Sequence, residues 1–143
     1  MSFDDAARHR RLYRSRVINN QERPRAQTAR ILVVDDHSVV REVLAEYLSL
    51  DGYRVAQAAN AFQALAALSS GEPFDLVLTD IDMPGGFDGL DLARLIREAN
   101  PATKVIVISG RSRLPDDTCA IDLFIRKPAT SHQIRRHVAQ ALR

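Results

Sequence analysis

The segment Ile31-Leu32-Val33-Val34-Asp35-Asp36, residues 31–36, is the clearest indication of the fold. Its four apolar residues, mostly β-branched, are typical of a strand that is buried on both faces. Two carboxylates follow directly, at the point where the predicted strand ends. Apolar residues then recur at helical spacing from Val39 to Leu48, and Gly52 gives a stop signal for a helix.

The same alternation continues over the rest of the chain. Further apolar segments predict strands at 53–58, 74–79, 104–108 and 121–126. The helices between and after them are expected to begin at the capping residues Asn60, Asp88 and either Thr130 or Ser131. This pattern favours an α/β fold with a doubly wound, five-stranded parallel sheet in the order 2-1-3-4-5.

Composition excludes several classes of protein. The chain has 143 residues, which is the usual size of one domain. A single cysteine, Cys119, excludes an internal disulfide framework and fits a reducing compartment. No apolar run is long enough to span a membrane, and the first residues do not form a secretory signal. We therefore expect a cytoplasmic location.

Charge is distributed unevenly along the chain. Residues 1–30 hold eight arginines against three acidic residues, whereas residues 31–143 carry a net charge of −3. We predict a mobile or partner-dependent basic extension at 1–29 and one folded domain at 30–143. The extension is interpreted as a solvated segment, as a docking segment for an acidic partner or the acidic body, or as a nucleic-acid or membrane contact.

Polar side chains stand where the predicted strands stop. They are the pair Asp35-Asp36, then Asp80, Ser109 and Lys127. In open parallel sheets the carboxyl ends of the strands form the ligand site, so these groups are expected in one cleft. Clustered carboxylates either take up protons or hold a hard cation such as Mg²⁺. A lysine and a hydroxyl suit the remaining oxygens of a phosphoryl group.

Several longer segments carry a family resemblance. They are ILVVDDHSVVREVL, DLVLTDIDMP, DGLDLARLIR, KVIVISG and FIRKP, and they cover most of residues 30–143. Together they resemble the receiver domain of response regulators in two-component signalling. The resemblance implies a stand-alone, single-domain response regulator with the flavodoxin-like receiver fold.

The resemblance also implies residue roles. Asp80 is the expected phosphoacceptor, and its phosphoryl group comes from a partner phosphohistidine. Asp35 and Asp36 would hold Mg²⁺ together with Asp80 and the backbone carbonyl of Asp82. Lys127 would pair with the Asp80 carboxylate and then with the phosphoryl group.

Three further expectations concern the switch that follows phosphorylation. Ser109 would bond a phosphoryl oxygen, Phe124 lies at the aromatic switch position, and the Lys127-Pro128 bond is expected to be cis. The implied partner is a sensor histidine kinase or a histidine phosphotransfer protein, with no independent enzymatic turnover. The resemblance leaves the downstream target undetermined and a homodimer open, and we expect no DNA-binding domain.

Two other interpretations stay open. The first is a protein-binding receiver module that works independently of phosphorylation. The second is a magnesium-dependent phosphatase that uses Asp80 and Asp82 as nucleophile and general acid, although Pro84 stands where such enzymes carry Thr or Val.

The sequence departs from the family pattern at three places. Gly85-Gly86-Phe87 lengthens the loop after Asp80 by one residue. The segment between Ser109 and Lys127 is short and contains Pro115, so a shortened or missing fourth helix is expected. Gly110 stands where alanine is usual. Finally, Asp82 and Arg111 hold positions that tune phosphoryl lifetime, and we predict that they pair across the site.

Overall fold

The computed structural model describes residues 28–112, 114 and 120–143. Its centre is one five-stranded sheet in the order β2-β1-β3-β4-β5, in which all neighbouring strands are parallel. The strands are β1 (Arg30–Val34), β2 (Arg54–Ala58), β3 (Leu76–Asp80), β4 (Lys104–Ser109) and β5 (Leu123–Arg126). The predicted α/β class and strand order are therefore confirmed.

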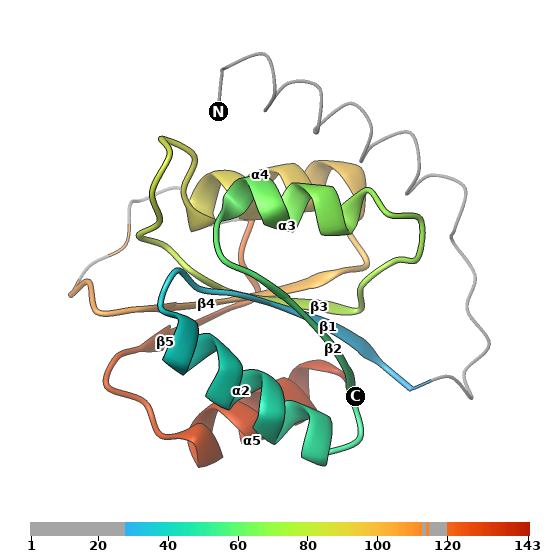
Figure 1. Cartoon of the computed structure of the whole chain (residues 1–143), viewed down its shortest axis with the longest axis vertical. Coiled ribbons are helices and arrows are strands. Elements are labelled where there is room, and N and C mark those ends of the chain that lie inside the picture. The colour runs from blue at the N-terminus through green and yellow to red at the C-terminus, as the bar shows by residue number, and fades with distance from the viewer. Residues whose placement is uncertain (1–27, 113, 115–119) are drawn as a thin grey trace.

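The helices form two layers around the sheet. They are α2 (Ser38–Leu50), α3 (Ala61–Leu68), α4 (Gly89–Ala99) and α5 (Ser131–Ala141). Figure 1 shows α3 and α4 together on one face of the sheet and α2 and α5 together on the other. This arrangement is expected for right-handed crossovers that change direction at β1.

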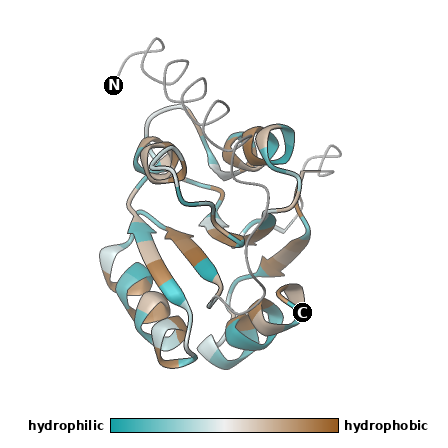
Figure 2. Cartoon of the chain, turned by 90° about the vertical axis from the view of Figure 1, so that its right-hand side faces the viewer, coloured by the Kyte–Doolittle hydropathy of each residue, from teal (hydrophilic) through white to brown (hydrophobic). Residues whose placement is uncertain are grey.

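The core is divided by the sheet into two apolar clusters. One contains Leu65, Leu92 and Ile96 of α3 and α4, and the other contains Leu44, Leu48 and Val138 of α2 and α5. Figure 2 shows the apolar colour concentrated on the strands, while the helices mix apolar and polar residues. The hydrophobic strands are thus covered on both faces, as the run at 31–34 predicts.

The predicted caps are observed, but three strands begin later than predicted, the strand at 53–58 by one residue. Asn60, Asp88 and Thr130 each accept hydrogen bonds at the start of a helix. The strand predicted at 74–79 begins at Leu76, and the Asp75 carboxylate just before it accepts a hydrogen bond from the Arg30 amide. Similarly, the strand predicted at 121–126 begins at Leu123.

Hydrogen bonds fix the connection from β4 to β5 at the end that directly precedes β5. The Asp122 carboxylate accepts hydrogen bonds from the Val105 amide at 2.7 Å and from Arg97 Nη2 at 2.6 Å. The described residues of this connection, which are 110–112, 114 and 120–122, lie in no helix, and 113 and 115–119 lie outside the described residues. No helix within the described ranges is long and apolar enough to cross a membrane.

Candidate functional site

The register of the strands places the predicted polar groups along one edge of the sheet. Val34 pairs with Thr79, so the next residues, Asp35 and Asp80, lie on adjacent strands. Asp80 pairs with Ile108, directly before Ser109. Ser109 in turn pairs with Arg126, directly before Lys127. Because neighbouring strands are about 4.8 Å apart, the four groups belong to one site.

Asp80 is the buried centre of this site. The residue is 7% exposed, and Lys127 Nζ lies 3.2 Å from its Oδ2 atom. The hydroxyl of Thr79 donates to the backbone carbonyl of Asp80 at 2.8 Å, which fixes the peptide from which the carboxylate projects. These contacts hold the Asp80 carboxylate at a defined position beside the Lys127 ammonium group.

Ser109 and Lys127 are joined through the backbone. The Lys127 amide donates to the Ser109 carbonyl at 2.9 Å, and the hydroxyl of the fully buried Ser109 accepts a bond from the Arg111 amide at 3.2 Å. The Lys127-Pro128 bond is cis, as expected. The structure therefore brings the hydroxyl and the ammonium to the same end of the sheet as Asp80.

The acid pair differs in burial. Asp35 is buried and accepts a hydrogen bond from the His37 amide at 2.8 Å, whereas Asp36 is exposed. One ligand atom of each of Asp35, Asp36 and His37 can lie within 4.8 Å of the others, so these residues could share a cation. The His37 side chain is exposed, and its Nδ1 lies 3.4 Å from Asp36 Oδ1.

The donor set fits a hard cation. Two adjacent carboxylates of unequal burial, with the Asp80 carboxylate on the next strand, offer the oxygen ligands that Mg²⁺ prefers while leaving room for water. Of the two buried carboxylates of this site, Asp35 and Asp80, only Asp80 has a lysine partner among the described residues. A divalent cation would balance the remaining negative charge.

A second ion pair lies over the site. Arg111 Nη2 is 2.5 Å from Asp82 Oδ1, and Nε is 3.4 Å from Oδ2. This hydrogen bond raises the pKa of the Arg111 guanidinium. Both residues line a hollow of about 520 Å³, together with Asp36 and Phe87. The pair thus joins the loop after β3 to the segment after β4.

Two more residues complete the surroundings. A Cβ atom placed on Gly89 would lie 2.0 Å from the Asp80 carbonyl oxygen, so only glycine fits where α4 begins. Sequence reasoning missed this contact, because nothing in the sequence shows which backbone Gly89 approaches. Phe124 is partly buried against the α3–α4 cluster, and its predicted switch role is not tested by this single conformation.

Comparisons with known proteins identify the family to which the chain belongs. A sequence model of the response regulator receiver domain family matches residues 31–139. The transcriptional regulatory protein AruR of Pseudomonas aeruginosa is 40% identical over 117 residues, which cover 76% of this chain and 47% of AruR. The sensor protein EvgS of Escherichia coli K12 is 32% identical over 114 residues, which cover 77% of this chain and 9% of EvgS.

Solved structures show the same fold. The response regulator TrrA of Thermotoga maritima, in complex with Mg²⁺-BeF, superimposes with a TM-score of 0.72 at 36% identity, over 80% of this chain and 100% of that chain. A CheY-like receiver domain protein of Methanospirillum hungatei gives a TM-score of 0.75 at 28% identity, over 81% and 94% of the two chains.

The chain therefore belongs to the response regulator receiver domains, which are phosphoacceptor modules of two-component signalling. It spans less than half the length of AruR and less than a tenth of EvgS.

Proposed function

We propose that Asp80 of this chain accepts the phosphoryl group. The observation that carries the proposal is the buried Asp80 carboxylate, held 3.2 Å from Lys127 Nζ at the strand edge that also presents Asp35 and Ser109. A carboxylate oxygen of Asp80 attacks the phosphorus of a partner phosphohistidine. The P–N bond breaks, and its electron pair returns to the imidazole nitrogen. Lys127 and Ser109 stabilise the charge on the phosphoryl oxygens.

The cation ligands of the proposed site are Asp35, Asp36, the Asp80 carboxylate and the backbone carbonyl of Asp82. When bound, Mg²⁺ supplies neutralising charge to the phosphoryl oxygens. TrrA, which was solved with Mg²⁺-BeF, supports this assignment by its similarity to the chain. The chain's own residues provide the ligands, the nucleophile and the compensating cation.

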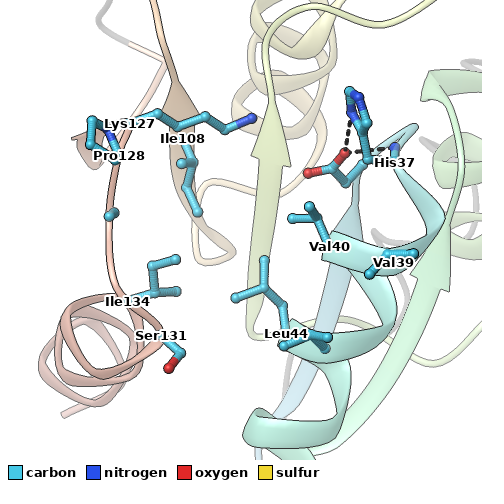
Figure 3. Close-up of a pocket in the computed structure, with 12 residues that line it drawn as sticks. His37, Val39, Val40, Leu44, Ile108, Lys127, Pro128, Ser131 and Ile134 are labelled. Atoms are coloured by element: carbon cyan, nitrogen blue, oxygen red, sulfur yellow. Dashed lines mark hydrogen bonds and ion pairs between the residues drawn. The ribbon is translucent and has the colours of Figure 1, made fainter.

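The partner is proposed to be a sensor histidine kinase or a histidine phosphotransfer protein. A groove of about 730 Å³ runs from Asp35 and Lys127 between α2 and α5, and its walls are mainly apolar. Figure 3 shows Val40 and Leu44 on one wall and Ile134 on the other. An apolar surface beside a phosphoryl site suits a helical partner that presents a phosphohistidine. No turnover of a separate substrate is expected, and a cytoplasmic location stays a prediction.

Intact mass spectrometry after incubation with Mg²⁺ and acetyl phosphate tests the assignment. The wild type should gain one phosphoryl group, and Asp80→Asn should gain none. Asp51→Asn is the matched control, since this carboxylate lies at the C-terminal end of α2, away from the site, and its loss should leave the gain intact. A gain in Asp80→Asn would overturn the assignment. No gain in any variant would favour a receiver module that works independently of phosphorylation.

We further infer that the Asp82–Arg111 pair shields the acyl phosphate from water. The pair joins the residues that follow β3 and β4 beside Asp80 and Ser109, and both side chains are partly exposed. Arg111→Ala should therefore lose its phosphoryl group faster than the wild type, measured as mass against time. An unchanged rate of loss would contradict the shielding role.

A further inference from the structure

The outer face of α2 is an unusual surface in this domain. The exposed large apolar residues of the described chain all lie on this helix: Val39, Val40, Val43, Tyr47 and Leu50. Val39 is 70% exposed and Leu50 is 74% exposed. A row of apolar side chains on one helix indicates an interaction surface rather than scattered exposure.

The same face is negatively charged. Val39, Val43, Glu46 and Leu50 recur at the spacing that places residues on one line along a helix, and Glu42 flanks this line. Glu42 and Glu46 form no ion pair with another described residue. The surface therefore suits a segment that combines apolar side chains with positive charge.

The chain itself contains such a segment. Residues 8–18 read RHRRLYRSRVI, with five arginines, four large apolar residues and no acidic residue. They lie outside the described residues. A second copy would suit the face less well, because a symmetric contact would bring together two faces that carry the same acidic residues.

The point of attachment favours the same occupant. The Ala29 carbonyl accepts a hydrogen bond from the Arg54 amide at 3.0 Å, and Arg54 follows closely after the end of α2 at Leu50. The residues between 18 and 29 can span up to about 33 Å. The thirteen residues of α2 are about 20 Å long. Residues 8–18 can therefore reach the whole outer face.

We propose that residues 8–18 dock on the outer face of α2, with their arginines beside Glu42 and Glu46. The docked segment competes with any partner that approaches the site along this helix. This regulatory consequence rests on the proposed phosphotransfer function, but the contact itself does not. A partner must displace the segment before it reaches Asp80.

Paramagnetic relaxation in the full chain tests the contact. A spin label is attached through Ser15→Cys in a Cys119→Ser background, and methyl signals are recorded. The expected result is a strong loss of signal for Val39, Val43 and Leu50, with little loss for the Ala66 methyl on α3. Because charge holds the segment, the loss should shrink at about 1 M salt, where screening acts within about 3 Å.

Glu42→Lys with Glu46→Lys should abolish the loss, and the milder pair Glu42→Gln with Glu46→Gln should reduce it. Both positions are exposed, so the fold should tolerate these changes. Asp80→Asn should keep the loss, which separates this proposal from the phosphoacceptor assignment. Equal loss on α2 and α3, or no loss on α2, would overturn the proposal. A loss that appeared only in mixtures of labelled and unlabelled chains would come from contact between two molecules. It would overturn the proposal, because the segment would then dock on a second copy.

Discussion

The helices on the two faces of the sheet differ in how they begin and in how far they bury their apolar side chains. On one face, α4 buries Leu92 and Ile96 completely and begins with a capping box between Asp88 and Asp91. On the other face, α2 has no side-chain cap and turns apolar residues toward solvent. The first face serves stability, since its apolar groups are used inside the domain. The second face keeps apolar surface available for an interaction.

The largest expected effect is the difference in unfolding free energy between truncating a buried side chain and truncating an exposed one. Leu92→Ala should lower the free energy of unfolding by about 2–5 kcal/mol, because it leaves a cavity beneath α4. Val39→Ala on α2 should change it by only about 0.5 kcal/mol or less. Chemical denaturation measures both values. Equal losses would show that the outer face of α2 contributes to the core after all.

The next effect tests the close contact between α4 and the site. Gly89→Ala should cost about 1–3 kcal/mol, because the added methyl group meets the Asp80 carbonyl oxygen. The displaced backbone should also slow phosphorylation by acetyl phosphate. Gly110→Ala is the control, since its Cβ would meet nothing within 4 Å. Equal stability of the two alanine variants would contradict a steric clash between an added methyl group at Gly89 and the Asp80 carbonyl oxygen.

A smaller effect distinguishes the two helix starts. Asp88→Ala should cost about 0.5–2 kcal/mol, since the Asp88 carboxylate accepts bonds from the Leu90 and Asp91 amides. His37→Ala should cost much less, because the His37 side chain makes no cap bond at the start of α2. Thermal unfolding of both variants checks the difference. A His37→Ala loss as large as that of Asp88→Ala would contradict it.

The smallest effect concerns the connection between α2 and α5. The hydrogen bond from Arg135 lowers the pKa of Asp51 below its ordinary value of 3.8. The folded state thus holds this carboxylate ionised more strongly than the unfolded chain does. The resulting stabilisation is complete above the ordinary pKa and is lost as the pH falls through the lowered value. Asp51→Asn should weaken this acid dependence, as measured by unfolding between neutral and acidic pH. An identical profile would exclude the pair as a contributor.

The alternation of strands and helices, with right-handed crossovers, predicted the strand order, and the change from apolar to polar residues after four of the strands predicted the row of polar groups. Neither pattern separated the residues of α2 that face the sheet from those that face solvent. Val39 and Val43 share the helical spacing of Leu44 and Leu48, but the sheet covers only one side of the helix. The role of Gly89 was missed for a related reason, since it depends on a contact with Asp80 in space.

A crystal structure of the protein with Mg²⁺ and beryllofluoride tests the phosphoacceptor role of Asp80 most directly. We expect beryllium to bind a carboxylate oxygen of Asp80, Ser109 and Lys127 to contact the fluorides, and the acid pair and the Asp82 carbonyl to hold Mg²⁺. Beryllofluoride on Asp36 or Asp82, or Mg²⁺ held by Asp35, Asp36 and His37 without Asp80, would contradict it.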